Sequence, residues 1–104
     1  TIANGFSQNN GGGIRMNQGS ELILNEVMVN NNTAANSTGG GGIWNDRGSL
    51  TAVNSTFSAN QAGFGGAILN GNGVYHSDRS STVTLTNTTF GGNQATFLGS
   101  AILN

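Results

Sequence analysis

The sequence of 104 residues contains no cysteine, no proline and no lysine, and only seven of its side chains are charged. Without cysteine, neither a disulfide framework nor a cysteine-ligated zinc site can form. Three arginines and a formal net charge of −1 exclude a basic nucleic-acid-binding protein. No run of about 18 apolar residues is present, so we expect no insertion into a membrane.

Glycine (18), asparagine (17), threonine (11) and serine (10) fill more than half of the chain. Disordered linkers can share this composition, but they usually carry many charges or prolines. The scarcity of alanine, leucine and charged residues also argues against a helical bundle or coiled coil. The apolar residues here are β-branched, aliphatic or aromatic and recur at fixed offsets. This pattern predicts β-structure with many turns.

Two short motifs alternate along the chain, four times each. One reads Phe-x-x-Asn and occupies residues 6–9, 57–60 and 90–93, with a weaker copy at 28–31. The other is a pair of small residues followed by isoleucine and a nearby asparagine, and its isoleucines are Ile14, Ile43, Ile68 and Ile102. A β-rich run precedes the Phe motif at 22–28, 50–57 and 83–90. A fixed motif order repeated four times indicates a repeat architecture.

The repeats predict an all-β, single-stranded parallel β-helix of about four coils, forming one domain over residues 1–104. The expected coils are 1–17, 18–45, 46–70 and 71–104, with a loop insertion at 71–81. A helical repeat is excluded because glycine doublets and β-branched runs interrupt every candidate helix. A β-sandwich would need hairpins rather than the same motif order. The register of the second coil stays open. Aligning Gly19 with Gly48 and aligning Leu22 with Leu50 require offsets along the chain that differ by one residue.

Alternation along the strands should turn Leu50, Ala52, Val83 and Leu85 inward. Stacked coils should then form two apolar columns. One column would contain Phe6, Met28, Phe57 and Phe90, and the other would contain Ile14, Ile43, Ile68 and Ile102.

Asparagine recurs at turn positions, where its side chain can donate to and accept from neighbouring coils. We expect one ladder of Asn9, Asn31, Asn60 and Asn93 and another of Asn25, Asn54 and Asn87. We expect Asn54 and Asn87 to point inward. Of the four glycosylation sequons, Asn36 is the candidate glycan acceptor because it falls in a loop.

The motifs Gly65-Gly66-Ala67-Ile68 and Phe57-Ser58-Ala59-Asn60 resemble the repeats of chlamydial polymorphic outer-membrane proteins and of other bacterial surface proteins with right-handed β-helices. The resemblance covers essentially the whole chain. It implies a right-handed parallel β-helix, an extracellular or cell-surface location and an adhesive role.

Enzymatic chemistry finds little support in the sequence. The carboxylates are Glu21, Glu26, Asp46 and Asp78, fewer than a polysaccharide-active β-helix needs. Asp46-Arg47 and Asp78-Arg79 are best interpreted as stacked surface ion pairs, and His76 has no partner for metal binding. We expect no catalytic residues, no metal and no cofactor, and a polysaccharide-active enzyme is the remote alternative.

Residues that follow the isoleucine column should face outward on one strand and stack into an apolar stripe. The candidate interaction stripe comprises Trp44, Leu69 and Leu103, with Met16 as a further member and Phe64 and Phe97 at its border. Two interpretations stay open: the stripe is an exposed interaction surface, or a loop such as 71–81 covers it.

Neither end of the chain shows a cap over its open strand edges. Ile2 and Phe6 at one end and Phe90 and Ile102 at the other would then be stacking residues. We expect a structural subunit that assembles head to tail into an extracellular or cell-surface filament of identical copies. The alternative is a segment of a larger, autotransporter-like surface adhesin that binds a host protein or a surface glycan.

Overall fold

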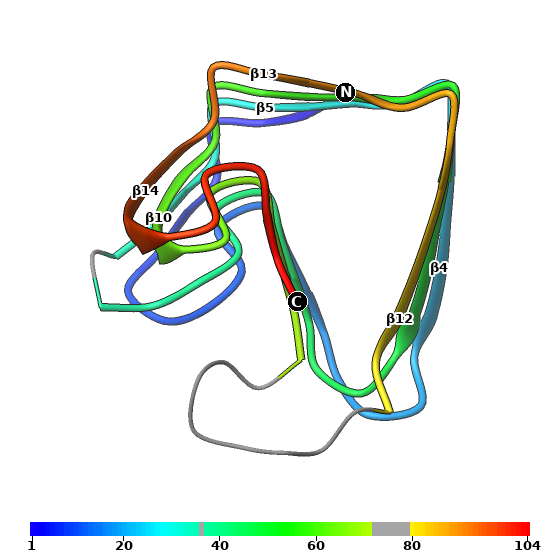
Figure 1. Cartoon of the computed structure of the whole chain (residues 1–104), viewed down its shortest axis with the longest axis horizontal. Coiled ribbons are helices and arrows are strands. Elements are labelled where there is room, and N and C mark those ends of the chain that lie inside the picture. Colours follow the sequence, from blue (N-terminus) through cyan, green and yellow to red (C-terminus); the bar gives the residue numbers. More distant parts are fainter. Residues whose placement is uncertain (36, 72–79) are drawn as a thin grey trace.

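The computed structural model describes residues 1–35, 37–71 and 80–104, and in those ranges it contains strands and turns but no helix. The chain follows the same closed outline several times, so that segments far apart in the sequence lie over one another (Figure 1). The direction of stacking is the shortest dimension of the molecule, 18 Å.

The strands form four parallel sheets, here named A to D. Sheet A contains β1 (Ile2–Ala3), β5 (Met28–Asn30), β9 (Thr56–Ser58) and β13 (Thr89–Gly91). Sheet B contains β2 (Phe6–Ser7), β6 (Thr33–Ala34), β10 (Gln61–Phe64) and β14 (Gln94–Leu98). Sheet C contains β3 (Ile14–Met16), β7 (Ile43–Asn45), β11 (Ile68–Asn70) and β15 (Ile102–Leu103). Sheet D contains β4 (Glu21–Asn25), β8 (Ser49–Val53) and β12 (Thr82–Thr86).

The chain visits the sheets in the order D, A, B, C, and every pairing joins one coil to the next. Coil 1 comprises β1–β3, coil 2 β4–β7, coil 3 β8–β11 and coil 4 β12–β15. The predicted all-β parallel β-helix of about four coils is therefore confirmed. Figure 1 shows sheets A and D as two straight sides, with β10 and β14 bulging outward beyond sheet C.

The isoleucine column is confirmed. Ile43 pairs with Ile14 and with Ile68, and Ile68 pairs with Ile102. Ile43 and Ile68 are fully buried, whereas Ile14 and Ile102 in the outer coils are half-buried. Each fully buried side chain of this size contributes about 1.5–3 kcal/mol.

Sheet D settles the register of coil 2. Leu22 pairs with Leu50, and the inward pairs expected for Leu50 with Val83 and for Ala52 with Leu85 are present. Gly19 instead lies level with Arg47, whose carbonyl accepts its N–H at 3.0 Å. Both residues have a positive φ, which explains why glycine occurs there.

The aromatic column differs from the prediction at two members. Phe57 and Phe90 pair and stack with ring centroids 5.1 Å apart, as expected. Below them the column continues through Val29 and Ile2, not through Met28 and Phe6. Met28 pairs with Thr56 and faces outward, and Phe6 pairs with Thr33 on sheet B, where it is 68% exposed. The prediction was wrong because it aligned the Phe motif by side-chain type, whereas strand alternation buries the neighbour of Met28.

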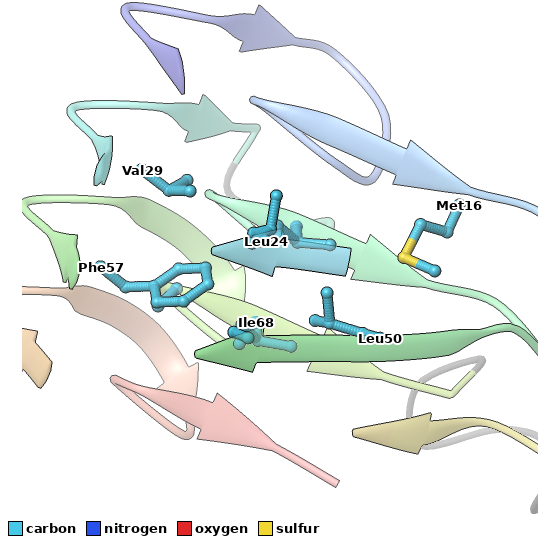
Figure 2. Close-up of a cluster of buried hydrophobic side chains, with 9 residues drawn as sticks. Met16, Leu24, Val29, Leu50, Phe57 and Ile68 are labelled. Carbon is cyan, nitrogen blue, oxygen red and sulfur yellow. The ribbon is translucent and has the colours of Figure 1, made fainter. Parts of the chain in front are cut away.

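The core lies between sheets A, C and D. Figure 2 shows side chains of coils 1, 2 and 3 converging there from facing strands, among them Met16, Leu24, Val29, Leu50, Phe57 and Ile68. Val29, Leu50, Phe57 and Ile68 are fully buried. The same inward position is therefore filled in successive coils, which is what a stacked repeat needs to build one continuous core.

Candidate interaction surfaces

An asparagine ladder runs through the corner between sheets A and B. Its members are Asn32, Asn60 and Asn93, so Asn60 and Asn93 are confirmed. Asn32 and Asn60 are fully buried. The expected members Asn31 and Asn9 were wrong: Asn31 is exposed and donates to Asn4, and Asn9 is exposed on the far side of sheet B. Three consecutive asparagines at 30–32 made the choice ambiguous in the sequence.

The bonds from one asparagine of this ladder to the next all run in one direction. The backbone N–H and the Nδ2 of Asn32 both donate to Oδ1 of Asn60, at 3.1 and 3.0 Å. Asn60 donates in the same way to Oδ1 of Asn93, at 3.0 Å for both bonds. The remaining Nδ2 hydrogen of Asn60 goes back to the carbonyl of Val29 at 2.9 Å. The ladder thus satisfies buried donors and acceptors that would otherwise be costly.

A second ladder lies on the outside of the corner between sheets D and A. Asn87 Nδ2 donates to Asn54 Oδ1 at 2.6 Å, which confirms this pair. Both side chains are exposed, so their expected inward orientation was wrong. Asn25 was also wrong: it pairs with Val53, and Glu26 occupies the corner instead. Glu26, Asn54 and Asn87 all have φ between 49° and 57°, a conformation that asparagine tolerates better than most residues.

A third ladder, which was not predicted from the sequence, lies at the end of sheet C. Asn45 Nδ2 donates to Asn70 Oδ1 at 2.8 Å, and Asn70 Nδ2 donates to Asn104 Oδ1 at 2.7 Å. Met16 holds the same position in coil 1. The signal was present in the asparagine that follows each isoleucine motif.

The outer face of sheet C carries the predicted column of Trp44, Leu69 and Leu103. Its coil-1 member is Arg15, not Met16, and the guanidinium carbon lies 4.7 Å from the Trp44 ring centroid. Met16 points the other way into the core, because alternate residues of a strand face opposite sides. The prediction that Met16 belongs to the stripe was therefore wrong.

Little of this column is exposed. Trp44 is 5% and Leu69 3% exposed, and Leu103 is half-buried. The indole Nε1–H donates to the carbonyl of Gly71 at 2.9 Å. A Cβ on Gly39 would collide with the Leu69 side chain, so the segment before β7 lies directly against it. The covered interpretation therefore holds for Trp44 and Leu69.

Exposed aromatic surface occurs on sheet B instead. Phe64 and Phe97 stack with centroids 5.1 Å apart on β10 and β14. Phe97 is 59% and its neighbour Leu98 51% exposed, which makes this the part of the candidate stripe open to solvent. Phe6, Ile23 and Met28 are also exposed, but Phe6 lies at the opposite edge of sheet B, on β2, and Ile23 and Met28 lie on sheets D and A.

Charged groups are sparse on the described surface. Asp46 Oδ1 accepts from Arg47 Nε at 3.1 Å, which confirms the ion pair, but Asp46 is buried and not on the surface as expected. Arg47 and Glu21 line an open hollow of about 330 Å³ whose other walls are glycine, serine and threonine. Across residues 1–35, 37–71 and 80–104, no three His, Asp or Glu side chains gather where they could hold a metal ion. The candidates His76, Asp78 and Arg79 and the sequon residue Asn36 lie outside the described residues.

Comparison of the chain with protein-family models, curated proteins and solved structures finds no match in any of the three. The described part of the chain contains no helix long and apolar enough to cross a membrane.

Proposed function

We propose that the chain is a non-enzymatic structural module of an extracellular or cell-surface β-solenoid and acts by stacking coil on coil. The observation that carries the proposal is that the coils stack in parallel at each of three joints. Sheets A, B and C continue through all four coils, and an asparagine ladder crosses the two joints between coils 2, 3 and 4. The resemblance of the Gly-Gly-Ala-Ile and Phe-x-x-Asn motifs to bacterial surface repeats supports the location.

In its simplest form the module stacks head to tail with identical copies. Four coils at a strand spacing of about 4.8 Å give an axial rise of about 19 Å per copy. Electron microscopy of the concentrated protein should then show filaments with this repeat. Ile102→Asp, which puts a carboxylate into the isoleucine column at the coil-4 end, should abolish them. Thr84→Asp on the exposed face of sheet D is the matched control, and filaments that survive Ile102→Asp contradict this form.

A second form, a segment of a larger surface adhesin, is favoured by a mismatch between the two ends. A joint between copies in the internal register would place Asn93 against Gly5 and Asn104 against Met16. Asn93 and Asn104, the last members of their two ladders, would then each lack an asparagine oxygen to donate to at the joint between copies. At the joints between coils 2, 3 and 4 such an oxygen is present. Dispersed short particles at high concentration, together with a longer polypeptide detected in the source by antibodies to this chain, would support this form.

For the adhesin form, Phe97 and Leu98 are the surface at which we propose a host protein or glycan binds. Aromatic faces exposed in this way commonly serve as contact surfaces. Phe97→Ala should weaken ligand capture on a glycan or host-protein array, whereas Ile23→Ala, an equally exposed apolar residue on another sheet, should not. Equal capture by both variants contradicts this assignment.

A further inference from the structure

The joints between coils follow one hydrogen-bonding rule at the corner between sheets A and B. From coil 2 to coil 3, Asn60 Oδ1 accepts the N–H and Nδ2–H of Asn32, and Asn60 Nδ2 returns a bond to the Val29 carbonyl. From coil 3 to coil 4, Asn93 does the same with Asn60 and with the Phe57 carbonyl, at 3.0, 3.0 and 2.9 Å. Each of these two joints therefore seats one primary amide between two donors and one acceptor of the coil before it.

Coil 4 presents the same three groups to whatever lies beyond it. They are the backbone N–H of Asn93, the second Nδ2 hydrogen of Asn93 and the carbonyl of Phe90. Phe90 pairs with Phe57, whose own carbonyl accepts from Asn93. Among the described residues, neither Asn93 donor has a partner on that side. The spacing of the three groups is set by the fold, because Asn93 Oδ1 is already held by Asn60.

We propose that this edge of coil 4 is a binding socket for a primary carboxamide, and that its occupant is the ladder asparagine of a further parallel coil. The proposal rests on the proposed coil-on-coil function and names the partner that such stacking selects. A carboxamide fits because its oxygen accepts both Asn93 hydrogens while its NH₂ donates to the Phe90 carbonyl. A carboxylate would satisfy the two donors but face the carbonyl with a second acceptor, and a hydroxyl has a single oxygen to meet all three groups, whereas a carboxamide divides them between two atoms.

The same chemistry discriminates against the first coil of another copy. Gly5 occupies the ladder position there, and its backbone N–H donates to Asn32 at 2.9 Å. Gly5 has no side-chain oxygen to offer Asn93, and its backbone carbonyl already accepts from the N–H of Thr33 at 2.8 Å. The socket thus selects coils of the type of coil 2 or coil 3 over coil 1.

The test extends the full chain by one coil. A second copy of residues 46–70 is placed directly after Asn104, in the same way that Asp46 directly follows Asn45 in the native sequence. All extended chains carry Ser100→Gly, since Gly12, Gly41 and Gly66 hold this position wherever a coil lies above it. The parent extension keeps the copied Asn60, which lies over Asn93. The matched control has Asn60→Gly in the added copy only, which reproduces the situation at Gly5, and a second control has Asn60→Asp.

Hydrogen exchange of the Asn93 side-chain amide, followed by NMR, is the specific readout. Exchange should slow at least tenfold in the parent extension relative to the four-coil chain and recover in the Asn60→Gly control. The folding equilibrium constant should fall at least tenfold in that control, with the Asp version in between. Equal protection of Asn93 in parent and Gly control, with the new coil folded, overturns the socket. If no extension slows backbone hydrogen exchange in β12–β15, then coil stacking itself is overturned, and the proposed function with it.

Discussion

At the scale of single residues, the buried side-chain amide of Asn60 takes part in four hydrogen bonds. Its side chain accepts two bonds from Asn32 and donates to Val29 and Asn93. Replacing it leaves buried donors and acceptors on both neighbouring coils without partners, at about 1–3 kcal/mol for each group. We expect Asn60→Ala to lower the free energy of unfolding by about 3 kcal/mol or more, measured by chemical denaturation.

The control for this change is Asn25→Ala. Asn25 is exposed and belongs to none of the three ladders. Its replacement should change the free energy of unfolding by less than about 0.5 kcal/mol. Similar losses for both variants would mean that asparagine acts through the turns alone and not through the ladder.

A second residue is held in an unfavourable backbone conformation. Ala59 has φ of 52°, and the matching corner position is Asn4, Asn31 and Gly92 in the other coils. Left-handed backbone costs alanine about 1–2 kcal/mol, and glycine avoids this cost at some loss of chain entropy. Ala59→Gly should therefore raise the free energy of unfolding by about 0.5–1 kcal/mol.

Ala3→Gly is the matched test, because Ala3 is also exposed but has an ordinary strand conformation. It should lose about 0.5–1 kcal/mol. The two alanine-to-glycine changes should then shift the free energy of unfolding in opposite directions in one denaturation series. A loss at Ala59 as well would show that its conformation in solution is not left-handed.

At the scale of elements, a column of glycines sets how closely the turn before sheet C approaches the start of sheet B. Gly12, Gly41 and Gly66 lie one above another, and a Cβ on Gly66 would fall well inside 3.0 Å of the carbonyls of Gln94 and Ser100. Both obstacles are backbone of the next coil, which cannot move without displacing its strands. The Gly-Gly motif is thus a packing requirement of the stack.

Gly66→Ala should accordingly lower the free energy of unfolding by about 3 kcal/mol. Gly91→Ala should be neutral or raise it by about 0.5 kcal/mol, because nothing lies within 4 Å of its added methyl and its φ is not positive. Thermal and chemical denaturation of the pair measure both. If both variants changed the free energy of unfolding equally, the effect of Gly66→Ala would come from chain entropy and not from the contact between coils.

The strand columns show how far the sequence predicts such elements. Ile43, Ile68, Phe57 and Phe90 were placed correctly because periodicity and residue type agree at those positions. Met28 and Asn31 were misplaced because each has a neighbour of similar type, Val29 or Asn32, and only the corner geometry decides between them. Glu26 in a left-handed corner carries no sequence signal, since glutamate rarely adopts that conformation.

At the scale of the whole molecule, burial is uneven along the stack. Coils 2 and 3 supply every buried apolar residue except Met16, and among the described residues coil 4 supplies none. Solenoid repeats are stabilised by their neighbours, so coils with a neighbour on each side should open least often.

We therefore expect backbone hydrogen exchange to be slowest in β7, β8, β9 and β11 and fastest in β12–β15 and β1–β3. NMR or mass spectrometry of the native chain measures this gradient. Uniform protection across all four coils would indicate that the outer coils are covered in solution, as stacking on other coils would cause.

The functional surfaces were less predictable than the fold. The column of Trp44, Leu69 and Leu103 was correct in register, but its burial depends on how the segment around Gly39 crosses it, which periodicity does not encode. The unlike ends also escaped prediction, because Gly5 and Met16 stand where other coils have asparagine, and this is visible only once the register is known.

The one-way bonding of the inner asparagine ladder gives the molecule a direction of growth. Each coil presents N–H donors, and the asparagine Oδ1 of the next coil along the chain accepts from them. A chain that emerges amino end first can thus lay every new segment onto a template that is already complete. Each new segment finds its partners in the coil made just before it, and the solenoid can be lengthened by duplicating an inner coil such as coil 3, because Gly66 already leaves room for the coil that follows.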